Sequence, residues 1–191
     1  MKLRSKVLLG SVAALLMAAV GPAFADLSGA AISHVRVLVN PNVAIVPVLS
    51  TVDAGTVQTG NFTASIDYQV DANLQEVSFQ VDASPLYKGD DPTSSIVHPI
   101  PLNLSAGVLI QPANGNATGG HANVAAFSGG TGPIVQGFPT AATEVVQYSS
   151  SQNNHFSQNV NIKVVWNQND NELPTGEYSG VVQLTALLLP S

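Results

Sequence analysis

The sequence predicts an all-β protein, a Greek-key β-sandwich, on the basis of three observations. Apolar and polar residues alternate along several short runs, which is the pattern of strands with one buried face. Gly, Pro, Asn and Asp residues separate these runs, as in turns. No stretch of useful length has the spacing of an amphipathic helix. Short strands joined by such turns are typical of antiparallel sandwiches.

Residues 1–25 have the composition of a secretory signal peptide. Three basic residues precede an apolar stretch at 7–20, and Ala23-Phe24-Ala25 matches an A-x-A cleavage site. The apolar stretch is shorter than the roughly 20 residues that a membrane-spanning helix needs. We therefore expect export, with a mature chain that begins at Asp26.

The composition of the mature chain excludes several function classes. It keeps three basic residues, Arg36, Lys88 and Lys163, against twelve acidic ones, a formal net charge of −9. Three scattered cations form no basic patch, so we expect no nucleic-acid partner. The absence of cysteine excludes a thiol nucleophile, a thiolate metal site and a disulfide.

The beginning of the mature chain contains two extended runs. The run at 33–39 alternates and has one apolar face. That face consists of Val35, Val37 and Val39. After Asn40-Pro41-Asn42, a second apolar run at 43–49 includes Pro47, and because proline has no amide donor this run is expected at a sheet edge or a kink.

Four further alternating runs predict strands. The runs at 62–70 and 77–83 flank a turn at 71–73 and together predict a hairpin. A strand is expected at 160–166 and a long final strand at 178–189.

The segments between these runs are predicted to be irregular. Residues 84–101 form a proline-rich loop, and a strand is expected at 102–104 or at 108–110. Residues 111–138 are rich in Gly, Asn, Ala and Pro, which predicts a long surface segment with short strands.

The chain lacks the residue patterns of an enzyme or a metal site. Its histidines form no HxH or HExxH motif, and no G-x-S-x-G nucleophile motif is present. The histidines are His34, His98, His121 and His155. The acidic and amide residues at 90–91 and 167–172 lack the EF-hand pattern, so turn chemistry is the simpler explanation. We expect no catalytic residue, no cofactor and no bound metal.

Two ends of the mature chain resemble one protein family. The sequence ELPTGEYSGVVQLTALLLPS, at 172–191, is similar to the C-terminus of the major pilins of α-class chaperone–usher fimbriae, a group that includes colonisation-factor pili. The sequence HVRVLVNPNVAIVPVL, at 34–49, resembles the N-terminus of the same pilins, and DANLQEVSFQVDASPL, from 71, resembles them more weakly. Residues 113–159 have no counterpart.

The resemblance implies an incomplete immunoglobulin-like sandwich that is completed by donor-strand exchange. In that family an N-terminal extension of one subunit fills a groove in its neighbour. The extension would be residues 26–40 and the sandwich domain 41–191. The implied donor strand includes Ser33, Val35, Val37 and Val39, with a hinge at Asn40 and Pro41. The implied groove wall consists of Tyr178, Gly180, Val182, Leu184, Ala186 and Leu188.

The same resemblance implies a function and a set of partners. The chain would be a structural subunit of an extracellular pilus that mediates attachment, not an enzyme. Its partners would be identical subunits, a periplasmic chaperone, an outer-membrane usher and a possible host receptor or glycan. It would pass through the periplasm to the cell surface.

Two alternatives remain open. The valines at 33–39 are equally compatible with an ordinary first strand that pairs inside its own domain. The chain is also compatible with a secreted, monomeric binding module for a carbohydrate or protein, in which Trp166 or Tyr178 would form an exposed stacking platform, although core packing is the simpler role for both aromatics.

Overall fold

A computed structural model describes residues 33–113, 115–117 and 123–187. It divides the chain into two units, at 1–38 and 39–191. In the first unit, the described residues 33–38 carry no strand assignment. The predicted signal peptide lies outside the described residues. Within the described ranges there is no helix that could cross a membrane.

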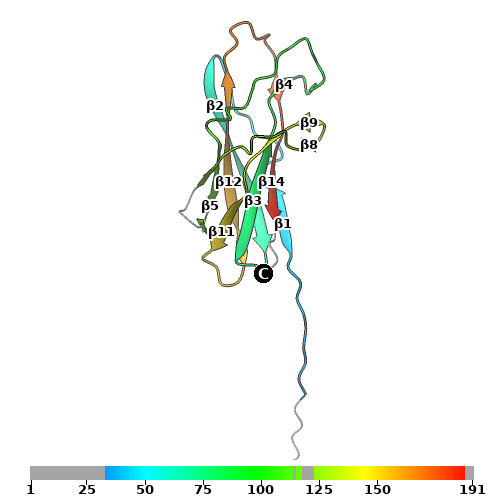
Figure 1. Cartoon of the computed structure of the whole chain (residues 1–191), viewed down its shortest axis with the longest axis vertical. Helices are drawn as coiled ribbons and strands as arrows, with labels where there is room; N and C mark the ends of the chain where they lie inside the picture. The colour runs from blue at the N-terminus through cyan, green and yellow to red at the C-terminus, as the bar shows by residue number, and fades with distance from the viewer. Residues whose placement is uncertain (1–32, 114, 118–122, 188–191) are drawn as a thin grey trace, which may run out of the picture. The chain divides into compact units, whose positions relative to one another are not determined.

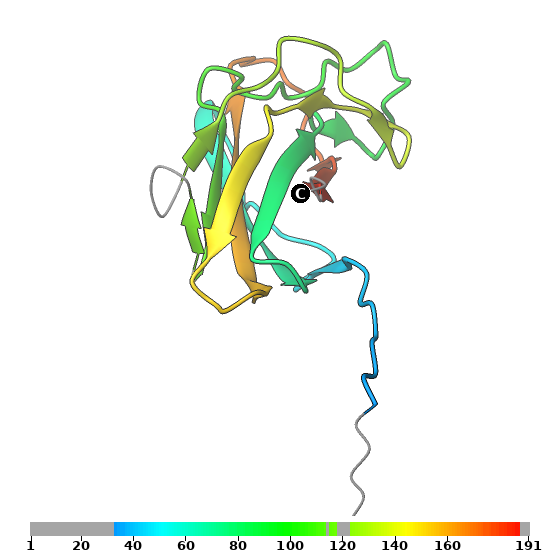
Figure 2. The same ribbon diagram turned by 60° about the horizontal axis from the view of Figure 1, so that its bottom comes forward.

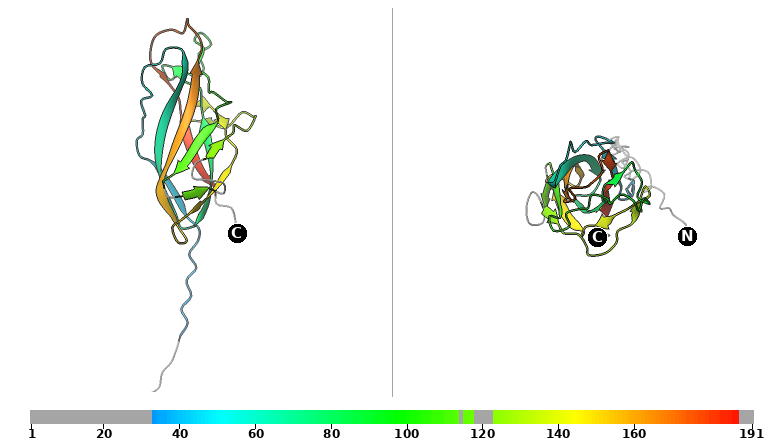
Figure 3. Two further views of the ribbon diagram at one scale, coloured as in Figure 1. Left: turned by 90° about the vertical axis from the view of Figure 1, so that its left-hand side faces the viewer. Right: turned by 90° about the horizontal axis from the view of Figure 1, so that it is seen from above.

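The second unit is all-β in its described residues, as predicted, and its strands form antiparallel sheets around one core, consistent with a β-sandwich. The first sheet has the order β1 (Val43–Pro47), β2 (Gly60–Ala72), β12 (Phe156–Gln168), β5 (Val108–Pro112) and β7 (Asn123–Ala125). Figure 3 shows β2 and β12 side by side along their length, where all thirteen residues of β12 are in register with β2.

The second sheet is built around β3 (Glu76–Ala83). One side of β3 pairs with β14 (Val182–Leu187), and the other side pairs with two successive strands. These are β10 (Ala141–Ala142) and β11 (Val146–Ser150), and β11 also pairs with β6 (Gly115–Ala117). Two small sheets pair β4 (Tyr87–Lys88) with β13 (Tyr178–Ser179) and β8 (Ile134–Val135) with β9 (Phe138–Pro139).

The core lies between the two main sheets, which Figure 2 shows facing each other. Alternation along each strand directs one set of apolar side chains inward. The fully buried ones include Val160, Ile162 and Val164 of β12. On the opposite sheet, Phe79 of β3 contacts Tyr148 and Phe156 with ring centroids 5.6 Å apart in both cases.

The predicted hairpin of 62–70 and 77–83 is wrong. These runs are β2 and β3, which belong to different sheets, so the turn between them connects the two sheets instead of joining paired strands. The reason is that both strands bury one apolar face, and here the two faces pack against each other. The predicted long final strand is also divided, because Gly180 and Val181 separate β13 from β14.

Other expectations of the strands agree with the structure. Pro47 is the last residue of β1, an edge strand, and 108–110 lies in β5. The segment at 111–138 contains only short strands in its described part.

Candidate functional site

The candidate site is formed by the free edges of β1 and β14. Each of these strands has a paired neighbour on one side only among the described residues. The two strands approach each other without forming a ladder, and Figure 1 shows them next to each other. A strand edge of this kind presents unpaired backbone groups that can accept a further strand.

The register of β1 shows which of its backbone groups are free. Next to β1, the amide of Val48 donates to the carbonyl of Asp67 on β2 at 2.9 Å. Bonded and non-bonded residue pairs alternate in an antiparallel ladder, so the odd-numbered residues of β1 direct their backbone groups away from β2. These residues are Val43, Ile45 and Pro47, of which the proline offers only a carbonyl.

The same reasoning applies to β14. Just before this strand, the amide of Ser84 donates to the carbonyl of Val181 at 3.0 Å. The register with β3 therefore directs the backbone groups of alternate residues toward the free edge. These residues are Val182, Leu184 and Ala186.

Tyr68 connects the two sheets at this edge. Its hydroxyl, on β2, donates to the carbonyl of Val182 on β14 at 2.8 Å. Burial raises the pKa of Tyr68 to about 12, so the hydroxyl stays protonated and donates at neutral pH. The carbonyl of Val182 keeps a second lone pair for another donor. Tyr68 thus holds β14 near β2 where no strand lies between the sheets in the described part of the chain.

The apolar side chains along this edge are less well covered than the rest of the core. Several residues that pack against the core remain partly exposed: Val43, Ile45, Phe62, Ile66, Val182 and Ala186. By contrast, Leu184 is buried. The edge therefore combines unpaired backbone groups with half-buried apolar side chains, and an added strand could satisfy both.

The structure distributes the predicted groove-wall residues over several elements. Val182, Leu184 and Ala186 lie on β14 and face the core. Tyr178 lies on β13, pairs with β4, and donates its hydroxyl to the carbonyl of Pro174 at 2.8 Å. Gly180 lies between the two strands against Ser84 and Pro85. Leu188 is outside the described residues.

The predicted donor residues are exposed. Ser33 is exposed, and the side chains of Val35, Val37 and Val39 are 89%, 79% and 74% exposed. Three valines in alternation with this exposure form an apolar strip with no cover in the chain as described.

The predicted hinge is followed by an anchor that the sequence did not reveal. Asn73, in the turn after β2, donates its side-chain amide to the carbonyl of Asn40 at 2.9 Å. The Oδ1 atom of Asn73 accepts from the backbone amide of Asn42 at 2.7 Å, and the backbone amide of Asn73 donates to the Asn42 carbonyl at 3.2 Å. These bonds flank Pro41 on both sides and fix the point at which the domain begins.

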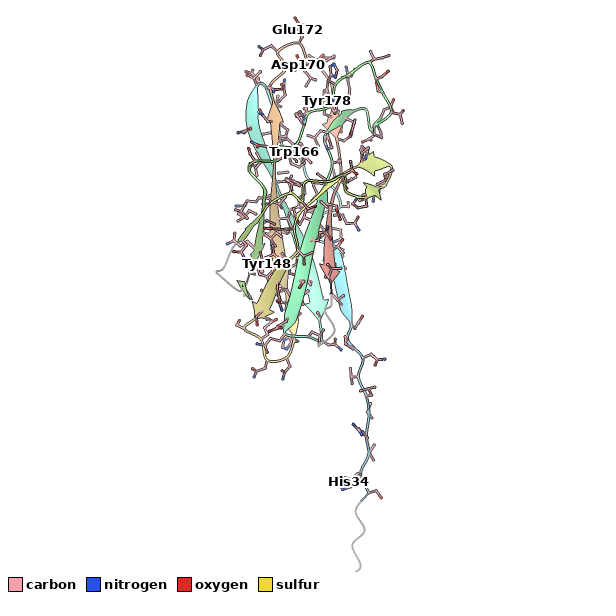
Figure 4. The ribbon with its side chains drawn as sticks, viewed as in Figure 1. His34, Tyr148, Trp166, Asp170, Glu172 and Tyr178 are labelled. Atoms are coloured by element: carbon pink, nitrogen blue, oxygen red, sulfur yellow. The ribbon has the colours of Figure 1, made fainter. Side chains whose placement is uncertain are left out.

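Trp166, one of the two aromatics expected to form an exposed platform in a binding module, is buried. Trp166 is 3% exposed, donates its indole nitrogen to the carbonyl of Ser84 at 3.0 Å, and stacks on Phe62 with ring centroids 5.9 Å apart, so it packs in the core (Figure 4). A pocket of about 260 Å³ lies between 98–101 and 168–173, but Trp166 does not line it.

In the described ranges, no group of three or more His, Cys, Asp or Glu residues is placed so that it could hold a metal ion. Asp170 and Glu172, labelled in Figure 4, lie in the loop after β12 and serve as turn residues there. Asp170 accepts from the amide of Glu172 at 2.9 Å.

No family model, curated protein or solved structure matches this chain.

Proposed function

We propose that this chain is a structural subunit of an extracellular pilus of the α-class chaperone–usher type. Its second unit would be an immunoglobulin-like sandwich that lacks one strand. Residues 33–39 of one copy would add to the free edges of β1 and β14 in the next copy, and repetition of this step would build a fibre. The proposal includes export, capping by a periplasmic chaperone, and assembly at an outer-membrane usher.

One observation carries the proposal. The same chain contains an exposed alternating valine strip and two neighbouring strand edges with unpaired backbone groups and half-buried apolar side chains. The spacing of the strip matches that of the acceptor, because the outward backbone groups of β14 also lie at three alternate residues. A strand that presents its valines to the core would hydrogen-bond to β14 at the same time.

The expected energies favour a stable assembly. Full burial of a valine contributes about 1.5–3 kcal/mol, and each net backbone hydrogen bond contributes about 0.5–1.5 kcal/mol. Ordering a segment of seven residues costs conformational entropy. Three valines and a short ladder of hydrogen bonds offset this cost only if most of the valines are buried together. Assembly should therefore fail when a single valine is replaced by a charge.

The monomeric binding module is the weaker proposal. It needs an exposed aromatic platform, whereas Trp166 is buried and Tyr178 is partly covered. It also leaves the valine strip and the free edges without a role.

The test compares two substitutions on opposite faces of the donor segment. The full chain is exported to a bacterial periplasm, and multimers are measured by size exclusion and by gels of heated and unheated samples. Val37→Asp should abolish multimers, because the aspartate would enter the apolar core of the neighbour. Leu38→Asp, on the other face, is the matched control and should preserve them. Wild-type multimers from Val37→Asp, or a stable monomer from the unaltered chain, would contradict the proposal.

A further inference from the structure

Asp82 on β3 is a buried carboxylate without a partner. The residue is 5% exposed, and its Oδ1 is buried with no hydrogen-bond partner among the described residues. Desolvation raises the pKa of this carboxyl group above its ordinary value. A buried charge without a partner is costly, so a cation that reached Asp82 would be stabilising.

The neighbours of Asp82 leave one direction of approach. Val81 and Ala83 point into the core, so Asp82 lies on the opposite face of β3. On that face its register partners are Ala142 of β10, which is buried, and Gln183 of β14, which is exposed. The exposed partner, Gln183, thus lies on the side of β3 that carries β14 and its free edge.

Arg36 is the cation with the right position in the sequence. Of the three basic residues after position 25, Lys88 lies on β4 and Lys163 on β12, and neither strand pairs with β14. Arg36 lies between Val35 and Val37, so in an extended strand its side chain points away from the valine face. When the valines enter the core, Arg36 lies on the same sheet face as Asp82.

Resting on the proposed function, we propose that Arg36 of the donated segment pairs with Asp82 of the accepting subunit across Gln183, and that this ion pair fixes the register of the donated strand. Val35 and Val37 would then lie beside Val182 and Leu184 in either strand direction. The donated strand would be two strand spacings from β3, roughly 10 Å, a distance that a long arginine side chain spans together with the aspartate.

Valines alone cannot set this register. A slip of two residues keeps a valine strip facing the core, because side chains alternate with a period of two. The slipped strand would instead place Arg36 beside Thr185 or Val181 and leave Asp82 unpaired. Buried polar pairs that select one register are the best-supported use of such groups.

The absence of cysteine from the chain allows the register to be measured by disulfide formation. Thr185 lies two residues from Gln183 on the same face of β14. In the proposed register it faces either His34 or Leu38 of the donor, depending on strand direction. Thr185→Cys is combined with His34→Cys in one full-length chain and with Leu38→Cys in another, and intersubunit disulfides are measured on non-reducing gels after export.

We expect one of the two combinations to form the disulfide and the other to form none. Adding Arg36→Gln or the isosteric Asp82→Asn should lower the yield of this disulfide, because a strand that slips by two residues places neither His34 nor Leu38 opposite Thr185, whereas Arg36→Lys, which keeps the charge, should retain it. Lys163→Gln is the matched control for the loss of one cation. Equal yields in both combinations, multimers with neither disulfide, or a disulfide yield that is unchanged by Arg36→Gln would overturn the proposal.

The two proposals fail in different ways. Absence of multimers from the unaltered chain contradicts strand donation itself, and the ion pair with it. Multimers that need Val37 but ignore Arg36 and Asp82 leave strand donation in place and remove only the ion pair.

Discussion

In the first sheet, the central strand β12 and the edge strand β1 differ in how completely neighbouring strands cover them. β12 has β2 on one side and β5 on the other, and its inward side chains are fully buried. β1, at one end of the same sheet, pairs with β2 alone among the described strands, and Ile45 remains half-buried. The same chain thus contains a fully paired region around β12 and an edge region around β1 and β14, built from similar apolar residues. The difference lies in strand neighbours and not in hydrophobicity.

The largest effect is expected from the same substitution in both regions. Ile162→Ala on β12 should lower the free energy of unfolding by about 2–5 kcal/mol, because it removes a fully buried side chain. Ile45→Ala on β1 should cost clearly less in an isolated subunit. Denaturant unfolding of both variants measures the difference. In multimers the stability losses of the two variants should become similar, since an added strand would bury Ile45. Equal losses in the monomer would contradict the difference between β1 and β12.

Gly180, directly before β14, tests how closely the edge region is packed against the end of β3. A Cβ at this position would lie 2.5 Å from Ser84 Oγ and 2.7 Å from the Pro85 carbonyl oxygen. We expect Gly180→Ala to lower the free energy of unfolding by about 1–3 kcal/mol through overpacking. Gly130→Ala is the control, because its nearest neighbour would be at 3.5 Å. Thermal unfolding with equal shifts for both variants would contradict the close fit.

Tyr68 and Tyr148 are matched hydroxyls in the two regions. Tyr148, fully buried, donates to the Ile110 carbonyl at 2.9 Å, and Tyr68 donates to Val182 at the free edge. Either Tyr→Phe change should cost about 1 kcal/mol in the monomer. Only the Tyr68→Phe cost should shrink in multimers, where a donated strand can supply another donor to Val182. Unfolding of monomer and multimer forms measures both.

The pKa of Tyr68 gives this comparison a pH dependence. The folded-state value of about 12 lies above the ordinary 10.0, because burial penalises the phenolate. The protonated Tyr68 hydroxyl therefore contributes to the free energy of unfolding below pH 10. This contribution is lost as the pH rises from about 10 to 12, at ~1.4 kcal/mol per pH unit for one group. Tyr68→Phe should reduce the alkaline slope of unfolding free energy against pH. An unchanged slope would show that the hydroxyl is not buried in solution.

Alternation in the sequence predicted which residues share a face but not which strands pair. The runs at 62–70 and 77–83 fit a hairpin and a crossing between sheets equally well, because either arrangement buries one face of each run. Only contacts with distant strands, such as β12 with β2, decide between them. The family resemblance, not the alternation, singled out Val182, Leu184 and Ala186, which do face the core, and Pro47, expected at an edge or a kink, lies in the edge strand β1.

Other residues of the candidate site left no recognisable pattern. Tyr68 continues an alternating run like any core residue, and its partner Val182 is 114 positions away. Asn73 resembles an ordinary turn residue, and Asp82 occupies an outward position where an acid is normally solvated. Their roles depend on what the fold places against them, so a single sequence could not reveal them.

The smallest effect is expected at the side-chain anchor that precedes β1. Asn73→Ala removes the side-chain bonds to Asn40 and Asn42, which are exposed, so the free energy of unfolding should fall by less than about 1 kcal/mol. Its clearer consequence is local, because β1 pairs only with β2 in the described part of the chain and should fray from its beginning. Hydrogen exchange at the Ala44 amide, which the register directs toward β2, should accelerate. Asn103→Ala, which removes comparable exposed side-chain bonds in another turn, should leave that exchange rate unchanged. Equal exchange in both variants would mean that β1 is held by its ladder with β2 alone.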